Sequence, residues 1–391
     1  MIAKTQAIVA REPTEPLKPN WAMEEVTLGG FGDDEMLVDM IATGICHTDI
    51  VLSSVPAGAI GIAYPKIVGH EGIRNPVGVE LASIVREIGK NVKTVQPGDP
   101  ILLSFYSCRT CEQCRTEHPA YCDQFAKGNY IGRQDTMETA SDSQPVWSQF
   151  FGQSSFAQTT VASEASVVNV KNLIKNLDEL KLLAPLGCGF QTGMGAIQNI
   201  GLATPNDVVL ITGLGAVGMG AIMTAKILKC KSIIAVDRVK SRLEIAKSLG
   251  ATHIIDTSDS AFTTLYEAVR RLIPLGASVA IETTGVPTII EQSVQATTPR
   301  GRFIQIGVPP LQYELSVNLT QHINSGRSIM GCIEGDCVPE NAIPQMIDWY
   351  RSGNFPIDKL VEYFDATDYE HALRKLKNGE TIKPVLIWEQ S

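Results

Sequence analysis

Short apolar segments alternate with helical patterns in the second half of the chain. From about residue 205, apolar runs typical of buried strands are separated by stretches in which apolar residues recur at helical spacing. The apolar runs are Val208–Ile211, Ile233–Val236, Val279–Ile281 and Phe303–Ile306, and the helical patterns cover 216–229, 240–249 and 288–296. This alternation predicts an α/β fold with a doubly wound parallel sheet.

The first half of the chain has a different pattern, in which Gly and Pro interrupt short apolar runs up to about Cys188. Runs such as Met36–Ile41 and Ile101–Leu103 are typical of short strands between turns. The polar segment Asp135–Gln149 is expected to form a surface loop. Beyond about Ile333 the alternation is lost again. Two domains are therefore predicted, which suits a chain of 391 residues.

Composition restricts the class of protein. Hydrophobic residues make up 44% and charged residues 19%, as in globular proteins. With a net charge of −9 and no basic cluster, the chain is not expected to bind nucleic acid or an anionic membrane. The start of the chain lacks the apolar core of a signal peptide, and no apolar run is long enough to span a bilayer. We expect a cytoplasmic protein, in which clustered cysteines indicate metal rather than disulfides.

A glycine motif at 213–218, G-L-G-A-V-G, follows one predicted strand and opens a predicted helix. In such a unit Gly213 allows a tight turn, Gly215 lets the backbone approach a pyrophosphate, and Gly218 lets the helix pack close to the strand. Asp237 ends the next predicted strand, where a carboxylate hydrogen-bonds the ribose hydroxyls and repels the 2′-phosphate of NADP. The motif predicts NAD binding, a preference that the adjacent Arg238 would soften.

Four cysteines form one compact cluster in the sequence. Cys108, Cys111, Cys114 and Cys122 have the spacing C-x2-C-x2-C-x7-C. Four thiolates this close in sequence can close a tetrahedral shell around one zinc ion. The spacing differs from that of bacterial ferredoxins, although an iron–sulfur cluster stays an alternative. We expect a structural zinc that holds a loop.

A second set of possible ligands is dispersed. Cys46 lies in G-I-C-H-T-D, His70 in G-H-E-G and Cys188 in G-C-G. Each residue alone is compatible with an ordinary buried side chain. Together, two thiolates and one imidazole would leave the fourth position of a zinc ion open, as catalytic sites require.

In their order along the chain, these motifs resemble those of the zinc-containing medium-chain dehydrogenases/reductases, the zinc alcohol dehydrogenase family. Within that family the chain looks most like the aryl-alcohol (benzyl alcohol) dehydrogenases. The segments that carry the closer match are Ile45–Asp49, Phe150–Ala157 and Lys383–Leu386.

The resemblance implies a Rossmann NAD-binding domain at residues 190–332. A GroES-like, mainly-β catalytic domain would comprise residues 1–189 and 333–391, with the structural zinc lobe at about 104–125. Such enzymes act on small-molecule alcohols or aldehydes, and a homodimer or homotetramer is expected.

The resemblance also implies roles for individual residues. Cys46, His70 and Cys188 match the catalytic zinc ligands. Thr48 matches the hydroxyl that takes the alcohol proton, Asp49 the carboxylate that orients the histidine, and Glu71 the acid behind the zinc. Phe150 and Phe151 match the substrate wall. The matches to cofactor-binding positions are His47, Thr192, Gly213, Gly215, Val217, Gly218, Asp237, Arg242, Ile306, Val308 and Lys383. Among these, His47 and Lys383 match pyrophosphate contacts, Arg242 a ribose contact, and Thr192 and Val217 contacts near the nicotinamide.

Two positions depart from the family pattern. Val51 stands where many alcohol dehydrogenases have a histidine that ends the proton relay, a histidine that the benzyl alcohol group also lacks. The segment Ile73–Leu81 is additional and follows directly on His70 and Glu71. It is compatible with a loop extension, with a lid over the substrate, or with damage to the site.

We therefore expect an NAD-dependent alcohol dehydrogenase that holds two zinc ions per chain and interconverts a primary, aromatic or conjugated alcohol and its aldehyde. Three alternatives stay open at this point. They are an NADP-dependent reductase of a conjugated carbonyl, an iron–sulfur electron carrier, and an inactive protein that keeps the zinc and NAD sites.

Overall fold

The computed structural model describes residues 3–15, 18–73 and 86–388, which form two compact units. One unit comprises Met1–Cys188, Val338–Ile347 and Ile357–Ser391, and the other comprises Gly189–Cys337 and Asp348–Pro356. The first unit therefore consists of pieces distant in sequence, and helix α10 (Pro339–Arg351) contributes residues to both units. Most of the additional segment Ile73–Leu81 lies outside the described residues.

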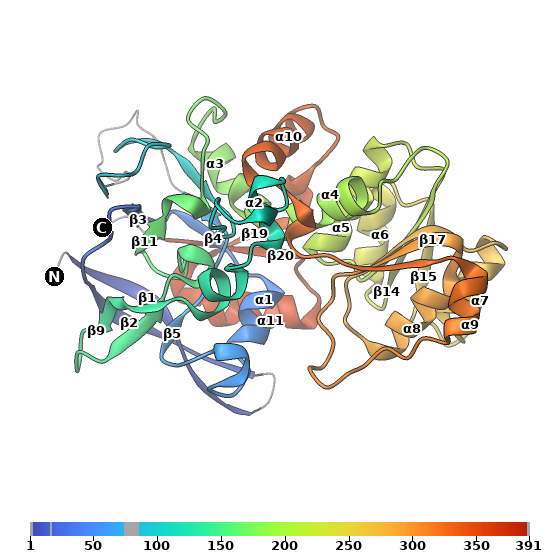
Figure 1. Cartoon of the computed structure of the whole chain (residues 1–391), viewed down its shortest axis with the longest axis horizontal. Coiled ribbons are helices and arrows are strands. Elements are labelled where there is room, and N and C mark those ends of the chain that lie inside the picture. Colours follow the sequence, from blue (N-terminus) through green and yellow to red (C-terminus); the bar gives the residue numbers. More distant parts are fainter. Residues whose placement is uncertain (1–2, 16–17, 74–85, 389–391) are drawn as a thin grey trace. The chain divides into compact units, whose positions relative to one another are not determined.

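The first unit is built mainly of β-structure (Figure 1). In its described part, a closed barrel has the order β1 (Ala3–Glu15), β2 (Lys18–Leu28), β9 (Arg133–Thr139), β10 (Pro145–Ser148), β5 (Lys66–Ile67). A three-stranded sheet joins β11 (Thr159–Ser163), β3 (Glu35–Asp39) and β7 (Glu87–Ile88). A six-stranded sheet has the order β12 (Val167–Asn169), β8 (Ile101–Leu103), β6 (Gly72–Ile73), β4 (Ala42–Gly44), β20 (Lys383–Ile387), β19 (Val361–Asp365).

Short helices complete the first unit. They include α1 (His47–Leu52), α2 (Glu112–Arg115), α3 (Leu177–Leu183) and α11 (Tyr369–Asn378). The prediction of a surface loop at Asp135–Gln149 is wrong, because β9 and β10 occupy most of this segment and pair antiparallel in the barrel. Met137 and Val146 face the core, and polar residues of the segment such as Thr136 and Ser148 are buried as well.

The second unit has a parallel sheet of six described strands, in the order β15 (His253–Asp256), β14 (Ser232–Asp237), β13 (Val208–Thr212), β16 (Ala277–Glu282), β17 (Thr297–Gln305), β18 (Ser328–Gly331). In chain order these positions read 3-2-1-4-5-6, the Rossmann arrangement. The helices are α4 (Gly189–Gly195), α5 (Ala216–Ile227), α6 (Lys240–Leu249), α7 (Leu265–Leu272), α8 (Pro287–Ala296) and α9 (Leu319–Ser325). The predicted fold class, a Rossmann domain with a GroES-like domain, is confirmed.

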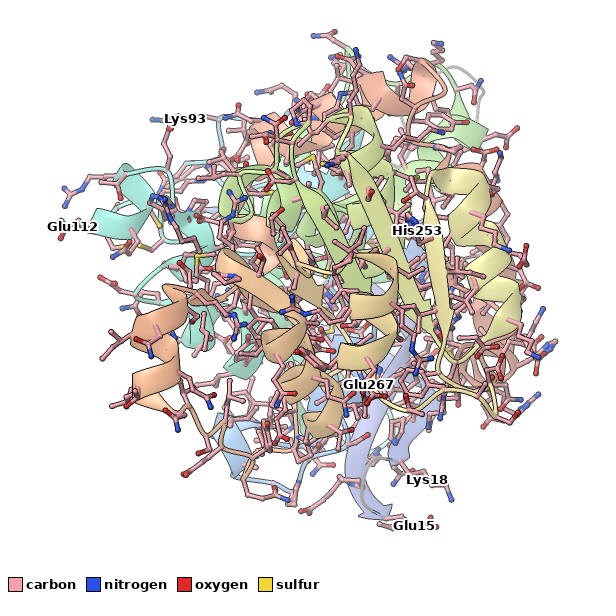
Figure 2. The ribbon with its side chains drawn as sticks, turned by 90° about the vertical axis from the view of Figure 1, so that its right-hand side faces the viewer. Glu15, Lys18, Lys93, Glu112, His253 and Glu267 are labelled. Atoms are coloured by element: carbon pink, nitrogen blue, oxygen red, sulfur yellow. The ribbon has the colours of Figure 1, made fainter. Side chains whose placement is uncertain are left out.

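In the amphipathic helix α7, the apolar side chains of one face are buried and the polar side chains are mostly exposed. Leu265 and Val269 on α7 are buried, and the hydroxyl of Thr264 caps the helix by accepting from the N–H of Glu267 at 3.1 Å. Figure 2 shows Glu267 on α7 and His253 on the edge strand β15. No helix in the described part of the chain is long and apolar enough to cross a membrane.

Candidate zinc and cofactor sites

A buried carboxylate organises the start of the first helix. Cys46 immediately precedes α1, and its backbone N–H donates to Oδ2 of Asp49 at 2.9 Å. The other oxygen, Oδ1, accepts from the N–H of Gly69 at 3.0 Å and lies 2.8 Å from Nδ1 of His70. Asp49 therefore fixes the turn at Cys46 and the orientation of the His70 ring together.

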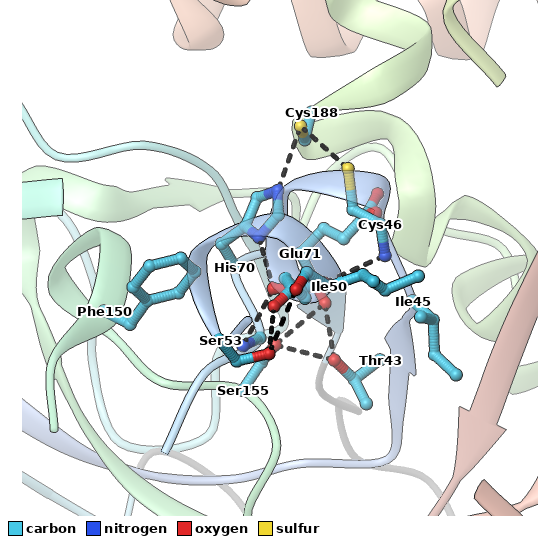
Figure 3. Close-up of polar contacts among 12 residues, drawn as sticks. Thr43, Ile45, Cys46, Ile50, Ser53, His70, Glu71, Phe150, Ser155 and Cys188 are labelled. Carbon is cyan, nitrogen blue, oxygen red and sulfur yellow. Dashed lines mark hydrogen bonds and ion pairs between the residues drawn. The ribbon is translucent and has the colours of Figure 1, made fainter. Parts of the chain in front are cut away.

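The three dispersed donors meet in the first unit. The Sγ atom of Cys188 lies 3.1 Å from Nε2 of His70 and 3.9 Å from Sγ of Cys46 (Figure 3). All three donor atoms lie within 4.8 Å of one another, and the His70 side chain has no exposed surface. Residues far apart in sequence thus present two sulfurs and one nitrogen to one point.

This donor set fits a zinc ion. With Zn–S and Zn–N bonds of about 2.3 and 2.0 Å, tetrahedral donors lie roughly 3.3–3.8 Å apart. The observed separations bracket that range. Asp49 opposite Nδ1 favours the tautomer with the proton on Nδ1, which leaves the Nε2 lone pair for the metal. Three protein donors would leave a fourth coordination position of the zinc ion open.

The ionisation of the donors favours a cation at this point. The hydrogen bond with Cys188 and the nearby His70 lower the pKa of the Cys46 thiol well below its ordinary value, against the effect of burial. Burial lowers the pKa of His70, but Asp49 and Cys46 outweigh it and raise that pKa well above its ordinary value. Negative charge thus accumulates around the His70 ring, and a metal cation would compensate it.

Glu71 and Lys383 form a buried ion pair beside this cluster. Nζ of Lys383 donates to Oε1 of Glu71 and to the carbonyl of Ile45, the latter at 3.1 Å. Burial raises the pKa of Glu71 to about 7, although the ammonium of Lys383 opposes this shift. The expected contact of Lys383 with a pyrophosphate stays a prediction, since its ammonium points to Glu71 in this structure and its side chain is 2% exposed.

Three polar residues that the sequence analysis did not single out hold the backbone at His70 and Glu71. The carbonyl of Glu71 accepts from Thr43 Oγ1 at 2.7 Å and from Ser155 Oγ at 3.1 Å. The carbonyl of His70 accepts from Nε2 of Gln153 at 2.9 Å. The only signal in the sequence was the polar run Gln153–Ser155 after two aromatic residues, and without the fold it indicated no partner.

The four cysteines between Cys108 and Cys122 also bring their sulfurs together. Sγ of Cys114 lies 3.9 Å from that of Cys108 and 3.4 Å from that of Cys111, and all four sulfurs lie within 4.8 Å of one another. Backbone N–H groups point to the sulfurs, including that of Cys111 to Cys108 at 3.3 Å and that of Cys108 to Cys122 at 3.2 Å. Against the effect of burial, hydrogen bonds with Thr110 lower the pKa of Cys108 to about 6. Four converging sulfurs fit a closed zinc site.

Two phenylalanines pack directly on His70, one of the three converging donors. The Phe151 ring stacks on the His70 ring with centroids 4.3 Å apart, and the Phe150 ring meets His70 edge-on at 5.7 Å. Both phenylalanines come from the single turn Phe150–Gly152 and are almost fully buried. The expected substrate wall therefore lies against the expected zinc ligand His70.

The glycine motif has the geometry of a phosphate-binding turn. Gly213 has φ +86°, which favours glycine, and a Cβ on Gly218 would lie 1.9 Å from the carbonyl of Gly213. A Cβ on Gly215, the residue before α5, would meet nothing within 4 Å. Two glycines thus permit the tight turn and the close helix, while the third leaves open space beside the helix N-terminus. This cradle fits a pyrophosphate.

Asp237 closes the other side of the turn. Its Oδ2 accepts from the N–H of Leu214 at 2.7 Å, and its Oδ1 accepts from the N–H groups of Arg238 at 2.7 Å and Val239 at 2.9 Å. A carboxylate has about four lone-pair positions, so one is left for a ribose hydroxyl. Arg242 lies in the first turn of α6, where burial lowers its pKa while Asp237 raises it.

Glu282 is a buried carboxylate that the sequence analysis missed. It ends β16 with no exposed surface and accepts from the N–H groups of Thr284 at 2.7 Å and Gly285 at 3.1 Å, and from Nε2 of Gln305 at 2.8 Å. Its backbone carbonyl accepts from the N–H of Ile306 at 2.9 Å. Glu282 therefore joins two loops at the carboxyl edge of the sheet, where dinucleotides bind in this fold.

The other residues expected at the cofactor or substrate differ in exposure. His47 is exposed and Thr48 half-buried, both in the first turn of α1. Thr192 is buried in α4, and Val217 lies in the first turn of α5. Val308 is 61% exposed in the loop after β17. Their roles stay predictions.

Known proteins match both units. Residues 32–172 match the model of the alcohol dehydrogenase GroES-like domain, and residues 216–352 match that of the zinc-binding dehydrogenase domain. Geraniol dehydrogenase of Castellaniella defragrans is 33% identical over 389 residues, which cover 98% of this chain and 97% of that protein.

Solved structures are similar over the whole chain. Benzyl alcohol dehydrogenase of Acinetobacter calcoaceticus has a TM-score of 0.85 at 33% identity, over 99% of this chain and 100% of that chain. An alcohol dehydrogenase zinc-binding domain protein from Burkholderia ambifaria has a TM-score of 0.88 at 34% identity, with the same coverage. Given these matches and the two donor clusters, the chain belongs to the zinc-containing alcohol dehydrogenase family of the medium-chain dehydrogenases/reductases.

Proposed function

We propose that the protein is an NAD-dependent zinc alcohol dehydrogenase that interconverts a primary alcohol carrying an aromatic or conjugated group and its aldehyde. The observation that carries the proposal is the convergence of Cys46, His70 and Cys188 directly beside the rings of Phe150 and Phe151. An open three-donor site next to an aromatic wall suits an alcohol with a flat apolar substituent.

Each of the site residues has its own role in the proposed reaction. Zinc at the three donors would supply a Lewis acid to the substrate oxygen, and bound NAD would supply the hydride acceptor. Thr48, two residues after Cys46, carries the hydroxyl that we assign to the alcohol proton. Asp49 keeps His70 oriented. Glu71 and Lys383 place a carboxylate and an ammonium behind the donors without net charge.

NAD is the proposed cofactor because Asp237 faces the glycine turn. Its hydrogen bond to Leu214 holds the carboxylate at the turn, where it can accept from a ribose hydroxyl and would repel a 2′-phosphate. Arg238 and Arg242 lie near this carboxylate, and their positive charge would weaken the repulsion of a 2′-phosphate without removing it.

The proposed substrate class rests on the wall formed by Phe150 and Phe151 and on the names of two related proteins. Two relatives are named for geraniol and benzyl alcohol, which are both primary alcohols with an unsaturated group beside the carbinol carbon. Apolar burial is worth about 25 cal/mol per Å2, so burying on the order of 100 Å2 more than ethanol would favour benzyl alcohol by roughly 2.5 kcal/mol.

The assay that tests the proposal is turnover of benzyl alcohol and ethanol with NAD and with NADP, on protein whose zinc content is measured. We expect two zinc ions per chain and higher kcat/KM for benzyl alcohol and for NAD. Turnover with NADP alone would support a reductase of the conjugated-carbonyl type. If protein that contains zinc turns over neither alcohol with either cofactor, the assignment as an alcohol dehydrogenase would be contradicted.

We also propose a homo-oligomer in the cytoplasm. Strand β18 is an edge of the second unit's sheet, and α9, which contacts β17, exposes Leu319 by 70% and Ile323 by 77%. An open strand edge and exposed apolar side chains of this kind favour pairing with a second copy. A mass in solution equal to one chain would contradict this. The thiol ligands require a reducing compartment, which favours the cytoplasm.

A further inference from the structure

A lysine is buried in the barrel of the first unit. Lys66 lies on β5, has no exposed surface, and is next in the ladder to Trp147 on β10. Its Nζ donates to the carbonyl of Ile131 at 2.6 Å. In the described part of the chain no carboxylate pairs with this ammonium. A buried amine with one protein acceptor is costly, so we asked what it supports.

The contacts of Lys66 lie on both sides of the aromatic wall. Ile131 ends the π-helical turn Lys127–Ile131, whose Tyr130 ring packs against Phe151 at 5.9 Å between centroids. Nζ of Lys66 also lies over the Phe150 ring at 5.6 Å and over the Trp147 ring at 5.9 Å. One ammonium therefore contacts the turn behind Phe151 and the ring of Phe150.

The wall needs such support because its backbone is strained. Gln149, Phe151 and Ser154 have φ between +55° and +61°, which is unfavourable for residues with a side chain. Ser154 holds one end, since its Oγ accepts from the N–H of Phe150 at 3.0 Å and donates to the carbonyl of Ile67 at 2.6 Å. Lys66, directly before Ile67, holds the other side.

We propose that Lys66 is a positioning residue that sets the preference for aromatic over short alcohols by holding the Phe150–Phe151 wall against the substrate position. The proposal rests on the proposed function. The contacts predict that the charged ammonium holds the wall most firmly, because it donates to Ile131 and lies over the Phe150 ring. A neutral amine would hold the wall less firmly, and a methyl group would not hold it at all.

The surroundings of the ammonium let its charge change near neutral pH. Burial alone lowers the pKa of Lys66 to about 7. Among the packed elements, the π-helical turn contributes the ionisable side chains Lys127 and Tyr130, and β1 contributes Arg11 beside the register position of Lys66. Strand β10 and the turn Phe150–Gly152 contribute none. None of these groups forms an ion pair or hydrogen bond with Lys66 in the structure.

The first test compares kcat/KM for benzyl alcohol and ethanol in the wild type and in Lys66→Met, which keeps the volume but removes the amine. Lys4→Met, which removes an exposed lysine paired with Glu25, is the matched control. We expect Lys66→Met to lower the benzyl-to-ethanol ratio on the order of threefold to tenfold through KM for benzyl alcohol. Zinc content and the control's ratio should not change.

The second test follows the same ratio of kcat/KM values as a function of pH. Ionisations of the enzyme that affect the turnover of both alcohols equally cancel in the ratio of the two kcat/KM values. This is because both values report the same free enzyme. We expect the wild-type ratio to fall as pH rises from 6 to 8.5, with a midpoint near 7, and the Lys66→Met ratio to stay flat, below the high-pH wild-type value. Tryptophan fluorescence of the resting enzyme should show the same midpoint only in the wild type, because Nζ lies over Trp147.

The outcomes separate the two proposals. A wild type that prefers benzyl alcohol, with the same ratio and pH course as Lys66→Met, would overturn the role of Lys66 and leave the function standing. A wild type that prefers ethanol would overturn the aromatic substrate. In that case a ratio that still depends on pH only in the wild type would support the role of Lys66.

Discussion

Oδ1 of Asp49 lies 2.8 Å from Nδ1 of His70, and neither side chain has any exposed surface. The contact orients the imidazole so that Nε2 faces the two cysteine sulfurs. Partners of this kind typically account for about 10–100-fold in metal affinity or activity. We expect Asp49→Asn to lose zinc from the dispersed site and to lower kcat/KM by that factor. Metal analysis should then find one zinc, in the lobe, and retention of both zinc ions with full activity would refute the role.

The lobe zinc should matter for stability more than for chemistry. Cys111→Ser removes one of four converging sulfurs, and the remaining thiolates would repel one another without the metal. We expect a lower melting temperature and one zinc per chain, with turnover per folded molecule largely kept. Normal stability with lost turnover would show that the two sites have the opposite roles.

Cofactor choice should follow the charge at residue 237. Asp237→Ser removes the carboxylate that would repel a 2′-phosphate, while a hydroxyl can still accept from Leu214. We expect the ratio of kcat/KM for NAD to that for NADP to fall by at least about tenfold, roughly 1.4 kcal/mol. Glu244→Gln on the same helix as Arg242, at an exposed ion pair, is the control. A wild type that prefers NADP would contradict the prediction.

Glu282 should affect the binding of NADH, although it is not one of the expected zinc ligands. Its carboxylate accepts from Thr284, Gly285 and Gln305, so Glu282→Gln turns one acceptor into a donor facing donors. Leaving such groups unpaired costs about 1–3 kcal/mol each. We expect weaker NADH binding by fluorescence titration, with unchanged zinc content. Wild-type affinity in this variant would show that the network does not position the cofactor loops.

Stability should depend on pH through Lys66. Burial lowers its pKa from 10.5 in the unfolded chain to about 7, so between these values the unfolded state binds more protons. The free energy of unfolding of the wild type should therefore rise relative to Lys66→Met as pH increases above 7, by about 2 kcal/mol between pH 7 and 9. If the difference in free energy of unfolding between the wild type and Lys66→Met is the same at pH 7 and at pH 9, Lys66 is not a buried amine that titrates near neutral pH.

Local patterns in the sequence were sufficient for the second unit and for the family. The strands and helices around Gly213, Gly215 and Gly218 are short-range units, in which apolar periodicity and glycine placement determine the turn geometry. The four-cysteine lobe is also local, since its ligands lie between Cys108 and Cys122. These features follow from neighbours along the chain, and the sequence determines them by itself.

Only the tertiary structure decided what surrounds the dispersed donors. No spacing rule connects His70 with its partners: the family resemblance implied Asp49 and Cys188, whereas Gln153, which donates to the carbonyl of His70, became visible only in the folded chain. The segment 135–149 was misjudged for the same reason, since β9 pairs with the distant β2, and polar residues such as Thr136 and Ser148 are buried in the barrel. The burial of Lys66 likewise depends on barrel closure, because the rings that surround it lie on other strands and turns. Contacts between distant segments carry no local periodicity, and they decide the environment in which each site residue acts.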